Sequence, residues 1–393
     1  MVAALDGVIE KFDLKGQTLG EVALGAVIKH SSDWNLAREC VIDSGLSLRT
    51  PAVDLQRACG TSLEAAIMIA NKVALGQIES GIAGGTDTVS DAPVVYPDAY
   101  RQILMDIHRA HSPLQRIGTI FRIRPKHFKP QFPGVKEPRT GLSMGESTEI
   151  TAKQWDVQRD HQDQLALSSH IKAAGAYDAG WFDDLVVPFN DAEEDNNIRR
   201  DTTFEKLAAL KPVFDKSGEG TMTAGNSTAL TDGAAAVLLA TEDWAQKKNL
   251  PILAYLTFAK ASAVNFIDDE GLLMAPAYAV SDMLKQAILT LQDFDFYEIH
   301  EAFAAQTVAT LKAWQSEEFC RTRLGRNAPM GPIDLACLNT KGGSIAIGHP
   351  FAATGARIIA TMAKLLHEKG SGRGLISICT AGGMGVSAIM EAA

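Results

Sequence analysis

Val53-Asp-Leu-Gln-Arg-Ala-Cys59-Gly-Thr-Ser-Leu-Glu-Ala65 marks a change of structure, because an extended apolar segment ends at a cysteine and a helical pattern begins directly after it. From Leu63 to Val73, apolar residues recur at i, i+3, i+4, i+7 and i+10, which is the stripe of a helix with one buried face. Cys59 is therefore expected at or just before a helix N-terminus.

A cysteine in this position has a chemical advantage over other cysteines. Unpaired backbone N–H groups and the positive end of the helix dipole favour the thiolate over the thiol, so Cys59 is a candidate nucleophile near neutral pH. The alternative is a small buried hydrophobic residue, as most lone cysteines are. Partner residues elsewhere in the chain decide between these two interpretations.

The flanking segments predict a parallel sheet. Gly76 and Gly81 bracket a turn, and residues 82–87 have the composition of a short buried strand whose glycines allow close backbone approach. Strand, helix and strand in this order form the repeating unit of a parallel sheet. The first fifty residues are expected to be helical, because apolar residues at 19, 22, 23, 26 and 27 have helix spacing.

The composition is that of an ordinary globular protein, with 46% apolar and 21% charged residues among 393. The net charge of −10 gives no general attraction to nucleic acid or to an anionic membrane. Five cysteines without metal-binding spacing disfavour a disulfide framework and a structural metal site. We expect a cytoplasmic protein, because the sequence shows no membrane-spanning run and no signal-peptide pattern; a mitochondrial matrix location would require a transit segment.

Residues 93–212 interrupt the sheet pattern with prolines and charges, and we interpret them as an inserted loop domain with helices of its own. Within them, residues 101–140 contain nine basic residues and two acidic ones, which leaves about seven excess positive charges. This segment is suited to a phosphorylated ligand, an anionic lipid surface or an acidic partner, unless it is only a solvated basic surface. The basic residues are Arg101, Arg109, Arg116, Arg122, Arg124, Lys126, Lys129, Lys136 and Arg139.

The end of the chain repeats the order seen at its beginning. The apolar run at residues 233–240 is suited to a central strand, and a second half begins near Pro251. A turn around His349 leads into a helix with apolar residues on one face, and a strand that ends at Cys379 follows. This recurrence of loop, helix, strand and glycine-rich turn predicts an internal duplication.

Three further segments contain residues suited to catalysis. A histidine stands in the turn Gly348-His349-Pro350, and in Glu298-Ile-His300-Glu301 a histidine and a carboxylate begin an apolar helix. Cys379 precedes Gly382-Gly383, a turn whose backbone N–H groups could point at an anion. Together these segments supply a base for a nucleophilic cysteine, a second thiol for proton transfer and donors for an oxyanion.

In these four motifs and their order, the chain resembles the thiolase family, and within it the β-subunit type of the fatty-acid oxidation trifunctional complexes. Cys59-Gly-Thr-Ser corresponds to the family's nucleophile motif, Gly348-His349-Pro350 to its Gly-His-Pro motif, and Cys379 with Gly382-Gly383 to its C-terminal cysteine and glycine turn. His300-Glu-Ala-Phe, where many thiolases have Asn-Glu-Ala-Phe, is typical of the trifunctional branch.

The resemblance implies an α/β fold of two duplicated βαβ halves in five α-β-α-β-α layers, with an inserted loop domain. Residues 1–92 and 213–243 would form the N-terminal half, residues 93–212 the inserted domain, and residues 250–393 the C-terminal half. Two features depart from the family pattern. Ala381 replaces a glycine of the C-terminal turn, which keeps the N–H donor but restricts the backbone. The N-terminal segment is expected to lack the family's opening strand.

The resemblance also implies a reaction, the CoA-dependent thiolytic cleavage of 3-ketoacyl-CoA in fatty-acid β-oxidation. Cys59 would be the nucleophile, His349 its base, and Cys379 the acid and base that serves acetyl-CoA and the incoming CoA. His349 and a water positioned by His300 would form one oxyanion hole, and the backbone N–H groups of Cys59 and Ala381 the other. Coenzyme A would be a co-substrate, and neither a permanently bound cofactor nor a metal is implied.

Binding partners follow from the same resemblance. Ser227 and Thr228 belong to the turn that corresponds to the family's pantetheine-contacting loop, and Met144 belongs to a motif near the acyl-binding region. A homodimer or higher oligomer is expected. A hydratase/dehydrogenase partner subunit and peripheral membrane contact through residues 101–140 are further hypotheses, whereas nucleic acid is not an expected partner.

Three alternative functions share parts of this pattern. A biosynthetic acetyl-CoA acetyltransferase would form acetoacetyl-CoA by the reverse reaction, but His300 and the basic insertion favour the degradative branch. A non-catalytic acyl-CoA-binding subunit is disfavoured because all four motifs are intact. A ketoacyl synthase would have a histidine at the second catalytic position, where this chain has Cys379.

Overall fold

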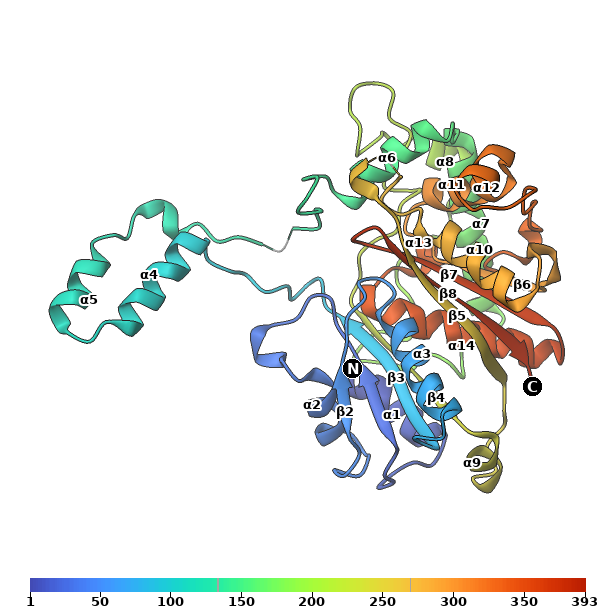
Figure 1. The fold of residues 1–393 in the computed structure, drawn as a ribbon, viewed down its shortest axis with the longest axis horizontal. Coiled ribbons are helices and arrows are strands. Elements are labelled where there is room, and N and C mark those ends of the chain that lie inside the picture. The colour runs from blue at the N-terminus through green and yellow to red at the C-terminus, as the bar shows by residue number, and fades with distance from the viewer. Residues whose placement is uncertain (133, 269) are drawn as a thin grey trace.

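The computed structural model describes residues 1–132, 134–268 and 270–393 and contains two four-stranded sheets (Figure 1). The sheet orders are β2-β1-β3-β4 and β5-β8-β7-β6. In each sheet a parallel pair, β1/β3 or β6/β7, is followed by an antiparallel pair, β3/β4 or β7/β8, as the predicted duplication requires. The strands are β1 (Glu21–Leu24), β2 (Ala52–Asp54), β3 (Ser80–Asp87), β4 (Gly233–Ala240), β5 (Ala254–Ala263), β6 (Phe296–Ile299), β7 (Arg373–Thr380) and β8 (Met384–Ala392).

Two helices, α3 (Thr61–Ala74) and α14 (Thr354–Lys369), pack between the sheets (Figure 1). Their apolar faces share one buried cluster with β1 and β3 on one side and with β7 and β8 on the other. This central layer joins the two halves, and the α/β class predicted from the sequence is confirmed.

The remaining helices cover the outer faces of the sheets or belong to the insertion. Helices α1 and α2 share a core cluster with the N-terminal sheet, whereas α10 and α11 share one with the C-terminal sheet. The bounds are α1 (Val2–Lys11), α2 (Leu36–Asp43), α4 (Asp98–Arg109), α5 (Pro113–Ile120), α6 (Met144–Gln154), α7 (Arg159–Asp178), α8 (Phe204–Ala208), α9 (Glu242–Lys247), α10 (Ala275–Ala287), α11 (Ala304–Gln315), α12 (Glu317–Thr322) and α13 (Ser344–Ile347). Short 3-10 turns are η1 (Ser31–Asp33), η2 (Pro125–Phe128), η3 (Phe266–Asp268), η4 (Leu291–Asp293), η5 (Leu335–Cys337) and η6 (Phe351–Ala353).

Two local predictions were wrong. Residues 21–24 form strand β1 and not a helix; three consecutive buried apolar residues suit a strand covered on both faces as well as a helix, so periodicity could not separate the two. β4 was expected to be central, but among the described residues it pairs with β3 alone and lies at the sheet edge. Its counterpart β8 carries β5 on the corresponding side.

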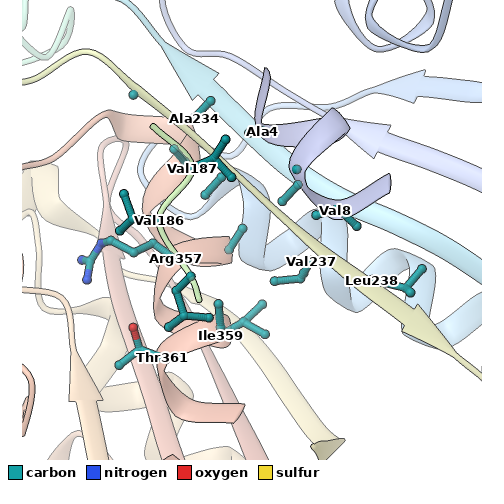
Figure 2. Close-up of a pocket in the computed structure, with 18 of the residues that line it drawn as sticks. Ala4, Val8, Val186, Val187, Ala234, Val237, Leu238, Arg357, Ile359 and Thr361 are labelled. Atoms are coloured by element: carbon teal, nitrogen blue, oxygen red, sulfur yellow. The ribbon is translucent and has the colours of Figure 1, made fainter. Parts of the chain in front are cut away.

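The open side of β4 faces a cavity of about 2190 Å³ (Figure 2). Side chains of α1, of residues 182–197 and of α14 form its other walls, and Arg357 lies on the α14 side. The two halves therefore differ most at this edge, where the C-terminal half has a strand and the N-terminal half has open space.

Helices α4 and α5 form a hairpin that projects away from the body of the molecule (Figure 1). They belong to the segment between β3 and α6, which carries the basic residues identified in the sequence. Among the helices in the described part of the chain, none combines the length and hydrophobicity needed to span a bilayer.

The approach of α3 to α14 sets the distance between the two halves. A Cβ atom on Gly355 would collide with the backbone nitrogen of Leu63 and would lie 2.8 Å from the Leu63 Cβ atom. The Ala356 N–H donates to the Ser62 hydroxyl at 2.8 Å in the same buried contact. Only a glycine fits here, because the obstructing atoms belong to a helix backbone that cannot rotate away.

We therefore expect Gly355→Ala to destabilise the protein by about 1–3 kcal/mol through overpacking. Urea unfolding measures this difference. Gly175→Ala is the matched control, because Gly175 lies inside α7 with open space around it, and alanine there should stabilise by about 0.5–1 kcal/mol. A Gly355→Ala protein as stable as the wild type would contradict the tight contact.

Candidate active site

Cys59 lies in a strained turn between β2 and α3. The Thr61 hydroxyl accepts from the Arg57 N–H at 2.9 Å and donates to the Ala58 carbonyl at 2.6 Å, which closes the turn. Ala58 has a φ of 43°, a conformation that non-glycine residues seldom adopt. Such backbone strain is concentrated at functional sites, and here it directly precedes the candidate nucleophile.

Two histidines from the C-terminal half meet Cys59. The ligand atoms of Cys59, His300 and His349 all lie within 4.8 Å of one another. The two imidazole rings are 4.2 Å apart between centroids and inclined by 49°. His349 occupies the turn between α13 and α14, where its N–H donates to the Ala229 carbonyl. His300 was expected to begin a helix, but it follows β6 in a loop, and α11 starts only at Ala304.

Cys379 completes the group from the end of β7. It is buried, and the residues beside the two cysteines touch, since a Cβ atom on Gly60 would lie 3.0 Å from the Thr380 Cγ2 atom; a charge on Cys59 would raise the pKa of Cys379. The structure thus brings together all four residues that the sequence singled out for catalysis. One of them, Cys59, comes from the N-terminal half, and the other three come from the C-terminal half.

Burial determines the resting protonation of both thiols. It raises the pKa of Cys59 to about 12, although backbone N–H groups of Ala381 and of Cys59 itself favour the thiolate. Burial also raises the pKa of Cys379 above its ordinary value. The expectation that a helix N-terminus makes Cys59 a thiolate was therefore wrong for the resting site, because desolvation outweighs the N–H donors. The same two N–H groups point at Cys59, where the second oxyanion hole was expected.

Both histidines are held neutral. Burial, with Arg357 nearby, lowers the pKa of His349 to about 3. Burial, His349 and Arg357 together hold the pKa of His300 well below its ordinary value. The resting site therefore contains two thiols and two neutral imidazoles, so a positioned base must remove the proton of Cys59.

Hydroxyl groups fix the orientation of the two rings. His300 Nδ1 lies 2.8 Å from the Ser344 hydroxyl, and His349 Nδ1 lies 2.7 Å from the Thr354 hydroxyl. The Nε2 atoms of both rings are buried without a hydrogen-bond partner among the described residues. Sequence reasoning missed Ser344 and Thr354, although both stand within five residues of His349.

Glu301 anchors the loop that carries His300. Its carboxylate accepts from the Ser169 hydroxyl at 2.7 Å, the Asn339 amide at 2.6 Å and the Ile345 N–H at 3.3 Å. These bonds join α7, residue 339 and α13 to the residue beside His300. Glu301 therefore has a structural role, and the sequence had identified only its position next to the histidine.

The inserted segment also reaches the site. The Glu137 carboxylate is buried and accepts from the Gly382 N–H at 2.6 Å. The glycine turn after Cys379 was expected to point N–H groups at an anion, and one of them binds this carboxylate of the protein. Sequence reasoning missed Glu137 because its partner is 245 residues away.

The predicted CoA-contacting residues occupy different surroundings. The Ser227 hydroxyl is buried without a partner in the described part of the chain, whereas the Thr228 hydroxyl donates to the Ser344 carbonyl at 2.6 Å. Met144 packs in a small apolar cluster with Cys379 and Phe303. The Ser227 hydroxyl thus has no partner in the described part of the chain, Met144 shares a cluster with Cys379, and the Thr228 hydroxyl is engaged within the protein.

Comparison with known proteins places these residues in a family context. Residues 1–243 match the family described as "Thiolase, N-terminal domain", and residues 250–392 match "Thiolase, C-terminal domain". A 3-ketoacyl-CoA thiolase of Yersinia pestis (strain Pestoides F) is 41% identical over 384 residues, which cover 96% of this chain and 87% of that protein.

Solved structures of related enzymes also match this chain over its whole length. The acetyl-CoA acetyltransferase of Bacillus anthracis matches with a TM-score of 0.81 and 28% identity, covering 100% of this chain and 93% of that one. Human mitochondrial 3-ketoacyl-CoA thiolase has the same TM-score and identity and is covered to 92%. Its complex with CoA is covered to 91%, again with a TM-score of 0.81 and 28% identity.

Proposed function

This chain belongs to the thiolase family, and we propose that it cleaves 3-ketoacyl-CoA with free CoA into acetyl-CoA and a shortened acyl-CoA. It is an acyltransferase that uses coenzyme A as a co-substrate. The observation that carries the proposal is the meeting of Cys59, His349 and Cys379 in one site, because thiolysis requires a nucleophilic thiol, its base and a second thiol.

The first half of the reaction uses the unpaired Nε2 atom of His349. It takes the Cys59 proton as the sulfur attacks the 3-keto carbonyl carbon. The C2–C3 bond then breaks, its electrons form the enolate of acetyl-CoA, and the Cys379 thiol protonates C2. The backbone N–H groups of Cys59 and Ala381 stabilise the oxyanion of the tetrahedral intermediate, where the loss of one donor costs on the order of 3 kcal/mol.

The second half returns each proton to its starting place. The Cys379 thiolate removes the proton of the incoming CoA thiol, and the CoA sulfur attacks the acyl carbon on Cys59. The thioester bond to Cys59 breaks, and the protonated His349 returns its proton to the Cys59 sulfur. Because a charge on either thiol disfavours a charge on the other, only one of the two sulfurs is ionised at each stage.

The direction of the reaction is the main alternative. A biosynthetic acetyl-CoA acetyltransferase would use the same residues to join two acetyl-CoA molecules, and structural similarity to the two classes is equal. The 41% identity to a protein named 3-ketoacyl-CoA thiolase favours degradation.

Thiolysis of 3-ketoacyl-CoA substrates of increasing chain length tests this proposal. We expect cleavage of medium or long chains in addition to acetoacetyl-CoA, and a loss of at least 10²-fold in Cys59→Ala, because the acyl-enzyme cannot form. Cys337→Ala is the matched control, because Cys337 lies in a different part of the chain and should leave the rates unchanged. Cleavage of acetoacetyl-CoA alone would favour the biosynthetic reaction, and full activity in Cys59→Ala would exclude Cys59 as nucleophile.

We further propose that the projecting hairpin of α4 and α5 docks on an anionic membrane surface. Large apolar side chains are exposed along it, including Leu114, Ile117 and Phe121. Of the nine basic residues in 101–140, only Arg101, Arg122 and Lys136 form ion pairs with described residues. Exposed apolar side chains combined with uncompensated positive charge suit the boundary between lipid headgroups and acyl chains.

Co-sedimentation with liposomes measures this interaction. We expect binding to vesicles that contain anionic phospholipid, weaker binding at high salt, and loss of binding in Leu114→Ser/Phe121→Ser. Leu335→Ser is the control, because Leu335 is 60% exposed but lies outside the hairpin. Absence of binding at low salt would contradict the membrane proposal, and capture of a hydratase/dehydrogenase subunit through the same residues would assign the hairpin to a protein partner. We also propose that the chain forms a homodimer, as the family resemblance implies.

A further inference from the structure

A chain of hydrogen bonds connects the central helix α14 to His300. The Arg357 Nη2 atom donates to the Ser344 hydroxyl oxygen at 2.9 Å, and this oxygen lies 2.8 Å from His300 Nδ1. Ser344 is fully buried, and its hydroxyl makes no other hydrogen bond to a described residue. The position of the hydroxyl proton therefore depends on these two neighbours alone.

The chemistry of the guanidinium group decides where that proton lies. A guanidinium can only donate, so Arg357 occupies a lone pair of the Ser344 oxygen. His300 Nδ1 is the only acceptor that the Ser344 O–H reaches among the described residues, and a buried O–H without a partner is costly, so the O–H donates to Nδ1. Because burial keeps His300 neutral, Nδ1 carries no proton and the ring proton is on Nε2.

We propose that Arg357 is a positioning residue that acts through Ser344 to hold His300 in the Nε2-protonated form, so that His300 presents a hydrogen-bond donor to the reacting atoms. This inference deepens the proposed thiolase function and rests on it. The buried Nε2 atom, which has no partner among the described residues, is then an N–H group available to an enolate oxygen or to a water that binds it.

His349 is arranged in the opposite way. Its Nδ1 faces the Thr354 hydroxyl, which accepts from no other described residue and can accept a hydrogen bond from Nδ1–H. His349 Nε2 is then an unprotonated acceptor, as a base for Cys59 requires. The two adjacent imidazoles thus carry their protons on different nitrogens. The cause is that His300 faces the Ser344 hydroxyl, which accepts from Arg357, whereas His349 faces the Thr354 hydroxyl, which does not.

The same arrangement makes the site unfavourable for a metal. Cys59, His300 and His349 place one sulfur and two nitrogens within 4.8 Å of one another, a donor set that zinc binds readily. A metal ligand must offer a lone pair, and a protonated His300 Nε2 has none. Arg357 and Ser344 therefore make this group of one thiol and two imidazoles a hydrogen-bonding site, although the same residue types could form a metal site.

Ser344→Ala tests the relay with little change in volume. We expect kcat for thiolysis to fall by about 10–100-fold with KM nearly unchanged, because the His300 donor acts on the transition state. Thr340→Val is the matched control; Thr340 lies in the loop before α13, and its buried hydroxyl has no partner among the described residues. Unchanged kcat in Ser344→Ala would overturn the proposal.

Cobalt binding provides a readout that a merely structural role would not produce. Without the Ser344 hydroxyl, His300 can place its proton on Nδ1 and offer Nε2 to a metal. We expect Co²⁺ to give a thiolate charge-transfer band in Ser344→Ala, little or none in the wild type, and none in Ser344→Ala/His300→Ala. Equal bands in the wild type and in Ser344→Ala would overturn the proposal. This measurement needs no catalysis, so it stays decisive if thiolysis itself is not observed.

A variant of Arg357 tests the first link of the chain. Arg357 lies near the buried Glu298, whose pKa burial raises to about 8, so the charge should be removed from both residues together. We expect Arg357→Met/Glu298→Gln to lower kcat, but to add little when combined with Ser344→Ala, because both changes break the same chain. Additive losses in kcat would show that Arg357 does not act through Ser344.

Discussion

The close contact between α3 and α14 is the constraint on which the other features depend. Gly355 removes a side chain where the backbone of Leu63 passes, and Ser62 accepts from the first turn of α14. Cys59 stands two residues before α3, and His349 precedes α14 with only Pro350 and η6 between them. One packing contact therefore determines how near Cys59 of the N-terminal half lies to His349 of the C-terminal half.

Burial then sets the chemistry of the site. Removal from water favours the uncharged forms of both thiols and both imidazoles, so none of these four groups is charged before substrate binds. Proton transfer from Cys59 to His349 creates a thiolate beside an imidazolium, and each of these charges is stabilised by the other. These groups therefore become charged only during the catalytic cycle, and neighbouring hydroxyls decide which nitrogen of each ring takes part.

The sequence predicted the elements that local pattern defines. The helix after Cys59, the strand before Cys379 and the four motifs that carry the candidate catalytic residues could be found because each depends on residues close together in the chain. Residues 21–24 and the edge position of β4 could not, since a short apolar run does not reveal what covers it. Ser344, Arg357 and Glu137 were missed for a related reason, because their importance comes from partners distant in sequence. The protonation of Cys59 was misjudged because the sequence shows a helix N-terminus but does not show the depth of burial.

Peptide mass spectrometry after incubation with a 3-ketoacyl-CoA in the absence of free CoA tests the central claim most directly. If Cys59 is the nucleophile and Cys379 only transfers protons, the peptide containing Cys59 gains the mass of the shortened acyl group and loses it when CoA is added. An acyl group found on Cys379 or elsewhere, or one that added CoA does not remove, would contradict the account.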